Sequence, residues 1–225
     1  MKILKLFMGD VRFQYRYGFY FLYAFFCVIY ILILKLLPMS WSLPIGILLI
    51  FSDPSIIGLI FSGAIVHLEL SEKTFDSLSI APISSPQYLI SKLLSISLIC
   101  VLVSLLIGLF NGLIIQWFFF VYSILIGSMF FSLIGFTCAF VTNSLNKFFL
   151  SIIPLMMLII IPGGLYQFFD MPIWTTIHPG IAIVEMLNNG ETSILSAIFL
   201  AIWFIVLFYI AEKVIMNKMK SHKRP

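Results

Sequence analysis

Six long apolar stretches constrain this chain more than any other feature of its sequence. They cover about 17–37, 43–66, 88–110, 117–141, a stretch that starts near 148, and about 193–212. A helix needs roughly 20 mainly apolar residues to cross about 30 Å of hydrocarbon, so each stretch is long enough to span a membrane. Only 10% of the residues are charged, against about 25% in soluble domains. The sequence therefore predicts an all-α integral membrane protein with a single transmembrane domain over residues 1–225.

Residues 1–16 are both basic and apolar, and they precede the first predicted span. Lysine and arginine side chains are mixed there with isoleucine, leucine and phenylalanine. This composition is typical of an amphipathic helix that lies on the membrane surface. An unstructured basic leader is the alternative, and the aromatic content favours the helix.

The distribution of charge predicts how the spans are oriented. Six spans place both termini on one side of the membrane, with the loops at about 67–87 and 142–147, and this side carries all of the 13 basic residues except Lys35. The opposite loops carry Asp170, Glu185 and Glu191. By the positive-inside rule we expect a multi-pass protein of the cell membrane with both termini in the cytoplasm. The net charge of +4 then reflects basic loops and tails that face one leaflet of the membrane, and it indicates no nucleic acid partner.

The most polar stretch between two spans lies at about 69–80. Residues at i, i+3, i+4 and i+7 share one face of a helix. This spacing predicts a charged helical face made of Glu69, Glu72, Lys73 and Asp76, with Phe75 and Leu78 off that face. Pro82 and Pro86 would end the segment. A short charged helix here is a handle on which a soluble partner could dock; the alternative is a solvated loop.

Asp53 is an acid placed inside the second predicted span. An ionisable residue at this depth is costly, so it usually faces another helix or a wet cavity. One interpretation is a place in a translocation path or in a hydrogen-bond network between helices. The other is a protonated or helix-capping aspartate, since Asp53-Pro54 is a suitable start for a half-helix.

Small residues recur at helical spacing in two of the spans. Gly58 and Ser62 form one pair, and Ser128, Ser132 and Gly135 form a stripe in the fourth span. Such residues let helix backbones approach closely. We expect a helix-packing interface, either within the chain or between subunits.

The fifth span is expected to be interrupted. Pro154 lies inside it, followed by Pro162-Gly163-Gly164, and broken helices occur in membranes where protein or a cavity covers the backbone. Residues 165–192 are too amphipathic for a further crossing. They are predicted to form a re-entrant outer segment, as a hairpin or short helices that dip into the outer leaflet.

No catalytic constellation is evident in the sequence. It has no GxxxxGK[ST] nucleotide loop, no HExxH pair and no GxSxG serine. The three cysteines, Cys27, Cys100 and Cys138, all lie in apolar runs, which argues against disulfides and metal ligation. We therefore expect no enzyme activity, no bound cofactor and no metal in this chain.

The stretch from Asp53 to Leu94 contains an ordered run of motifs, which are Asp53-Pro54, Gly58, Phe61, Gly63-Ala64, Leu68, Glu72-Lys73, Leu78, Ala81-Pro82, Tyr88-Leu89 and Ser91-Lys92. This run resembles the permease subunits of ABC-2 type exporters, and it is most similar to the fluoroquinolone or multidrug export branch. Ala81 stands where that branch usually has threonine before proline, and both Glu69 and Glu72 are present near the position of one acid.

The resemblance implies a half-transporter with the ABC-2 exporter fold. Two permeases, identical or homologous, would form the pathway in membrane lipid, and two ATPase subunits that hold ATP and Mg would dock below. The segment at about 69–80 would be the coupling helix. Its contact residues would be Glu69, Glu72, Lys73, Phe75, Asp76 and Leu78.

The apolar and aromatic spans favour a hydrophobic or amphipathic cargo, such as a drug, a lipid or a peptide, exported by alternating access. A stand-alone proton-coupled multidrug antiporter that uses Asp53 is the alternative function. A membrane anchor or immunity protein that transports nothing is the third. The exporter and the antiporter differ in their energy source, which is ATP for the first and a proton gradient for the second.

Overall fold

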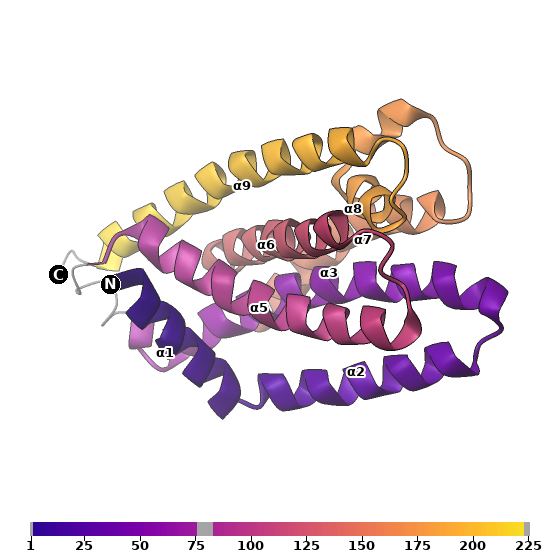
Figure 1. The fold of residues 1–225 in the computed structure, drawn as a ribbon. Coiled ribbons are helices and arrows are strands. Elements are labelled where there is room, and N and C mark those ends of the chain that lie inside the picture. The colour runs from indigo at the N-terminus through magenta and orange to yellow at the C-terminus, as the bar shows by residue number, and fades with distance from the viewer. Residues whose placement is uncertain (1, 76–82, 223–225) are drawn as a thin grey trace.

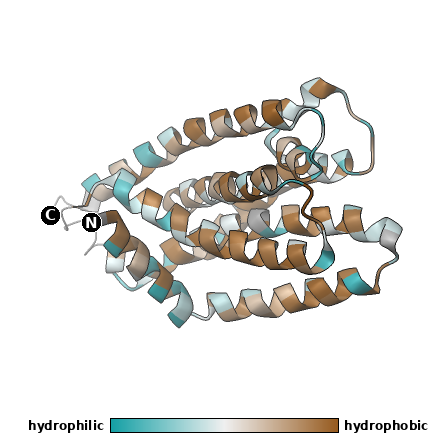
Figure 2. Ribbon diagram, viewed as in Figure 1, coloured by the Kyte–Doolittle hydropathy of each residue, from teal (hydrophilic) through white to brown (hydrophobic). Residues whose placement is uncertain are grey.

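The computed structural model describes residues 2–75 and 83–222 and places most of them in helices. Among these described residues, six helices are long and apolar enough to cross a membrane. They are α2 (Phe19–Leu36), α3 (Met39–Ser71), α5 (Ser85–Asn111), α6 (Trp117–Val141), α7 (Leu145–Tyr166) and α9 (Ser193–His222). Apolar residues dominate the middle of these helices, and polar residues gather toward one end of the bundle (Figure 2). The predicted helical multi-pass membrane protein is confirmed at this level.

Three further helices flank the spans within the described residues. α1 (Lys2–Arg16) is the predicted N-terminal helix, and it is separated from α2 by Gly18, which has the left-handed backbone that glycine adopts easily, at φ 76°. The predicted outer segment holds the short helices η1 (Ile173–Ile177) and α8 (Pro179–Leu187). Both the helix over 1–16 and short helices within 165–192 are therefore present.

α6 is the central helix of the bundle. It contacts α3, α5, α7, α8 and α9, and 72% of the residues in its most apolar stretch are buried, against 17% in α2 and in α9. Those two helices lie on opposite sides of the bundle (Figure 1). The start of α1, the end of α3, the start of α5 and the end of α9 lie together at one end (Figure 1), which we call the termini end. The opposite end is called the far end.

α7 is continuous, so the predicted interruption of the fifth span is wrong. The helix begins at Leu145 and runs to Tyr166 through Pro154 and Pro162. A proline inside a helix removes the bond from its own position to the carbonyl four residues earlier, which for Pro162 is that of Leu158. The side chain of His178 in the outer segment interacts with this freed carbonyl. Membrane helices tolerate proline where neighbouring groups serve the freed carbonyl, and α7 continues through both prolines.

The outer segment is fastened by a buried acid. All nine residues of α8 are buried, among them Glu185. The Tyr166 hydroxyl donates to Glu185 Oε2 at 2.7 Å, and the Thr192 backbone N–H and hydroxyl donate to Oε1 at 3.0 and 2.6 Å. Because both oxygens are satisfied, this carboxylate holds α7, α8 and the start of α9 together.

Candidate functional site

The chain turns sharply where α3 ends at the termini end. α3 continues to Ser71, so Glu69 belongs to the spanning helix. Glu72 caps the helix and Lys73 follows with a left-handed backbone, at φ 56°. The prediction that Glu69, Glu72 and Lys73 share one helical face is therefore wrong. The remaining predicted contact residues, Asp76 and Leu78, lie outside the described residues.

Glu69 lies in a buried ion cluster that joins three helices. Lys92 of α5 forms ion pairs with Glu69 of α3 and with Asp10 of α1, the latter at 2.5 Å. The Tyr88 hydroxyl donates to Glu69 Oε2 at 2.6 Å, and the Ser91 hydroxyl donates to Asp10. Lys92 and Glu69 are each 3% exposed. Buried charges persist only when they are paired and hydrogen-bonded, and this pairing explains why α3 continues past the predicted edge of its span.

Two more hydrogen bonds fasten α1 beside this cluster. Gln14 donates to the Ser95 hydroxyl of α5 at 2.8 Å, and the Tyr17 hydroxyl donates to Glu72. The bond to Glu72 raises the pKa of Tyr17, because ionising the phenol would break it and place two negative charges side by side. α1 is thus bound to the spanning helices by polar side chains, which its predicted role as a surface helix did not include.

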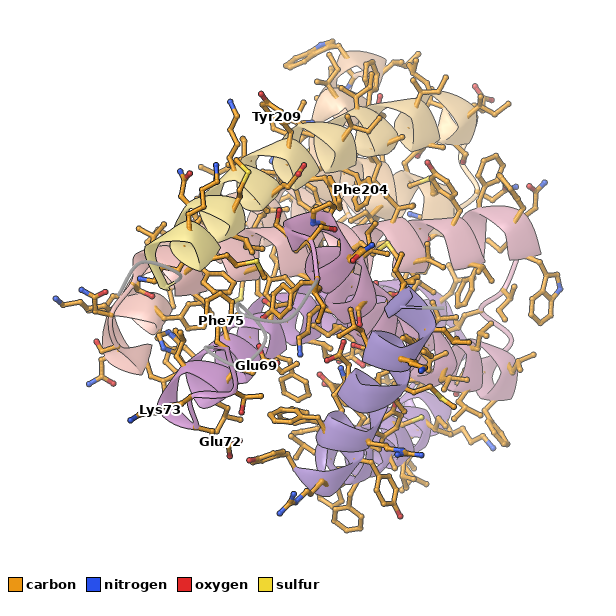
Figure 3. The ribbon with its side chains drawn as sticks, turned by 90° about the vertical axis from the view of Figure 1, so that its left-hand side faces the viewer. Glu69, Glu72, Lys73, Phe75, Phe204 and Tyr209 are labelled. Atoms are coloured by element: carbon orange, nitrogen blue, oxygen red, sulfur yellow. The ribbon has the colours of Figure 1, made fainter. Side chains whose placement is uncertain are left out.

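The described start of the α3–α5 connection has a buried side and an exposed side. Phe75 is fully buried, with its ring 5.1 Å from that of Phe140 in α6 and 5.9 Å from that of Tyr88. The expectation that Phe75 anchors a partner is therefore not met. Glu72 and Lys73 are exposed, and they lie at the edge of the termini end while Glu69 lies further inside (Figure 3).

Asp53 is buried in the middle of α3 and is 5% exposed. α3 continues through this position, which removes the helix-capping interpretation. The Tyr30 hydroxyl of α2 hydrogen-bonds the carboxyl group. Oδ2 has no partner in the part of the chain that the structure describes. Asp53 therefore joins α2 to α3 and keeps one free acceptor.

The small residues of α3 and α6 face each other. A Cβ added to Gly135 would lie 1.9 Å from Ser62 Oγ and 2.5 Å from the Leu59 carbonyl oxygen. A Cβ added to Gly58 would lie 2.7 Å from the Ser128 carbonyl oxygen and 3.0 Å from Ser132 Oγ. Of the two expected locations, the structure thus gives the interface within the chain, where these residues bring the two backbones together.

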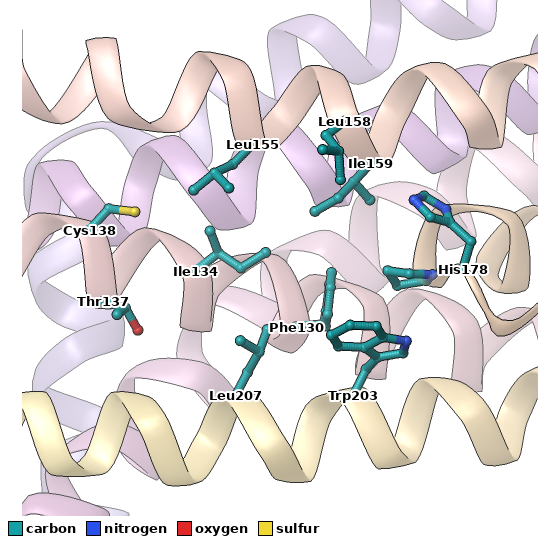
Figure 4. A pocket seen from close by; sticks show the side chains of 11 residues that line it. Phe130, Ile134, Thr137, Cys138, Leu155, Leu158, Ile159, His178, Trp203 and Leu207 are labelled. Atoms are coloured by element: carbon teal, nitrogen blue, oxygen red, sulfur yellow. The ribbon is translucent and has the colours of Figure 1, made fainter.

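A cavity of about 300 Å³ lies between α6, α7 and α9 (Figure 4). In the described chain the backbones of α7 and α9 do not approach each other closely, and the cavity lies in this gap, lined by side chains of both helices. No pattern in the sequence indicates this cavity, because the side chains that line it are almost all ordinary apolar residues of spanning helices. Its walls are Phe130, Ile134, Thr137, Cys138, Leu155, Leu158, Ile159, His178, Pro179, Trp203 and Leu207.

The few polar groups of this cavity are nearly all engaged. Thr137 donates to the Leu133 carbonyl at 2.7 Å, and Trp203 Nε1 donates to the Ile177 carbonyl at 2.9 Å. His178 Nδ1 is buried without a partner among the described residues. Burial lowers the pKa of His178, and its bond to the Leu158 carbonyl offsets part of this effect. The cavity therefore offers an almost wholly apolar surface, because this unpartnered nitrogen is itself buried.

Within residues 2–75 and 83–222 no three potential ligands come together in a way that could hold a metal ion. Cys27, Cys100 and Cys138 are free thiols. No family model and no curated protein matches the chain. Its function must therefore be argued from its own residues and geometry.

Proposed function

We propose that this chain is the transmembrane subunit of an ATP-driven exporter, moved by a separate ATPase that docks on the α3–α5 connection. The observation that carries the proposal is the buried cluster of Glu69, Lys92 and Asp10, which binds the root of that connection to α5 and α1. ATP and Mg would be held by the partner. This chain would bind neither and would catalyse no reaction.

The first support is that the exposed start of the α3–α5 connection lies between buried, tightly packed residues. Glu72 and Lys73 are exposed. Glu69 before them and Phe75 after them in the sequence are buried. A partner that displaced the exposed pair would displace α3 and α5 through Lys92, and it would displace α6 through the contact of Phe75 with Phe140. Rigid-body shifts of this kind underlie alternating access.

The second support is the charge of the termini end. Lys73, Lys147, Lys213, Lys218 and Lys220 belong to helix ends or connections at this end, which the positive-inside rule makes cytoplasmic. Nucleotide-driven partners are found in the cytoplasm. The apolar cavity under the α7–α9 gap suits the entry of a hydrophobic or amphipathic cargo from the lipid. A second permease copy would complete the pathway.

Charge reversal at the exposed pair tests the docking. The Lys73→Glu variant is expected to lose a co-purifying ATPase about tenfold, because charged contacts in an interface contribute at least ~1.4 kcal/mol when one partner is reversed. The measurement is the amount of a P-loop ATPase recovered with the chain in mild detergent. Lys147→Glu is the matched control, since Lys147 is also an exposed lysine at the termini end. Equal recovery with wild type and Lys73→Glu would contradict the proposed docking point.

The proton-coupled antiporter remains a second candidate because Asp53 is buried with one unpaired oxygen. The change Asp53→Asn tests it in everted vesicles, with uptake of a hydrophobic cationic dye as the readout. Under the ABC proposal we expect ATP-dependent uptake to persist, with a loss of less than about tenfold from the weakened contact to Tyr30. Abolished uptake in the variant, together with block of wild type by a protonophore, would instead support the antiporter.

A further inference from the structure

Lys35 is isolated at the far end of the bundle. It is exposed in the last turn of α2 and forms no ion pair within the described residues. Glu185, which the sequence assigns to the same side of the membrane, already accepts hydrogen bonds from Tyr166 and Thr192. The Lys35 ammonium lies 5.9 Å from the centre of the Phe110 ring of α5, a contact that leaves its three N–H donors free. This lysine is therefore a cation without a counter-charge at the edge of the membrane.

An apolar groove of about 530 Å³ ends at this lysine. It lies between α2 and α5, and near Lys35 its walls are Val28, Ile31, Leu32, Leu102, Leu106 and Phe110. Along α2 it extends from Tyr20 to Lys35, or about 22 Å at 1.5 Å per residue. A single leaflet contributes only about half of the ~30 Å hydrocarbon thickness. The groove as a whole is therefore longer than one leaflet is thick, so it is long enough for one acyl chain that starts at Lys35.

We propose that this groove is a binding site for a membrane lipid with an anionic phosphate headgroup. The phosphate lies at Lys35, and one acyl chain fills the groove between α2 and α5. Charge complementarity selects this occupant, because Lys35 is the one basic residue that the sequence assigns to the far side, whereas the groove beside it is apolar. A zwitterionic lipid offers the same chains but no net charge for the ammonium. This site does not depend on the proposed transport function.

Native mass spectrometry of the detergent-purified protein tests the site with phosphatidylglycerol and phosphatidylcholine of identical chains. Wild type is expected to hold at least tenfold more phosphatidylglycerol in its tightest site, and Lys35→Gln to reduce that preference below twofold. Val28→Trp fills the groove from a side chain that is 57% exposed, and it should lose both lipids with an unchanged unfolding temperature. Lys213→Gln is the matched control, since Lys213 also lies over an aromatic ring, that of Tyr209, but does not line this groove.

Basic residues at the termini end also attract anionic lipids, so the readout is the difference between variants. Equal retention of the two lipids by wild type, or an unchanged preference in Lys35→Gln, would overturn the proposal. Retention of inorganic phosphate alone would mean an ion site and no lipid site, which also overturns it. So would a dimer that Val28→Trp dissociates without any loss of lipid, because a second copy of the chain would then occupy the groove.

Discussion

The change Lys92→Met is expected to lower the free energy of unfolding by about 3–5 kcal/mol, because it leaves the buried carboxylate of Glu69 and the partly buried carboxylate of Asp10 without their counter-charge. Methionine keeps the length of the side chain and removes only the ammonium group. Asp10 and Glu69 would then retain the hydrogen bonds from Ser91 and Tyr88 but lose both ion pairs. The measurement is chemical unfolding of the purified protein in mixed micelles.

Two further variants show whether charge causes this loss. Lys147→Met removes an exposed lysine from the same end of the bundle and should change the stability by less than about 1 kcal/mol. Neutralising all three members, as Asp10→Asn, Glu69→Gln and Lys92→Met together, should recover much of the loss, because no buried charge then lacks a partner. If Lys92→Met unfolds like Lys147→Met, the cluster does not hold α1, α3 and α5 together.

Gly135→Ala is expected to prevent α3 and α6 from packing. The new Cβ would lie 2.5 Å from the carbonyl oxygen of Leu59, and this backbone atom cannot rotate away as the Ser62 hydroxyl can. Overpacking a core costs about 1–3 kcal/mol when side chains can adjust, and here the two helices must separate instead. We expect little monodisperse protein by size-exclusion chromatography.

Gly164→Ala is the control for this substitution. Gly164 also lies within a spanning helix, but an added Cβ would meet only Leu48 Cδ2, at an ordinary 3.9 Å. This variant should elute and unfold as wild type does. A Gly135→Ala protein that behaves in the same way would show that the backbones of α3 and α6 are not held at this close approach.

The sequence predicts the spans well because burial in lipid depends on local apolar length, which a single chain reveals. It predicts the role of Glu69 badly. The spacing of Glu69, Glu72 and Lys73 fits a helical face, but the partner that buries Glu69 is Lys92, 23 residues further on. In the same way, the Leu158 carbonyl that Pro162 leaves without its helical partner interacts with His178 of the outer segment. Contacts between distant residues of this kind leave no local pattern.

The candidate site can be predicted only in part, because only some of its residues stand out in the local sequence. Asp53 and the small residues of α3 and α6 are detectable because a polar or a small side chain is conspicuous among apolar ones. The cavity beside Trp203 is not detectable, since its walls are ordinary apolar residues and its shape arises from the separation of α7 and α9. The family resemblance implies that Phe75 contacts the partner, yet its ring is buried against that of Phe140.

Site-specific photo-crosslinking from position 72 tests the central claim, that an ATPase docks on the α3–α5 connection. A crosslinking amino acid in place of Glu72 would sit on the exposed start of this connection, and one in place of Trp174, which is 71% exposed, would serve as the far-end control. We predict a covalent adduct with a P-loop ATPase from position 72 and none from position 174, in intact cells. The absence of such an adduct from position 72, or an equal yield from both positions, would contradict the proposal.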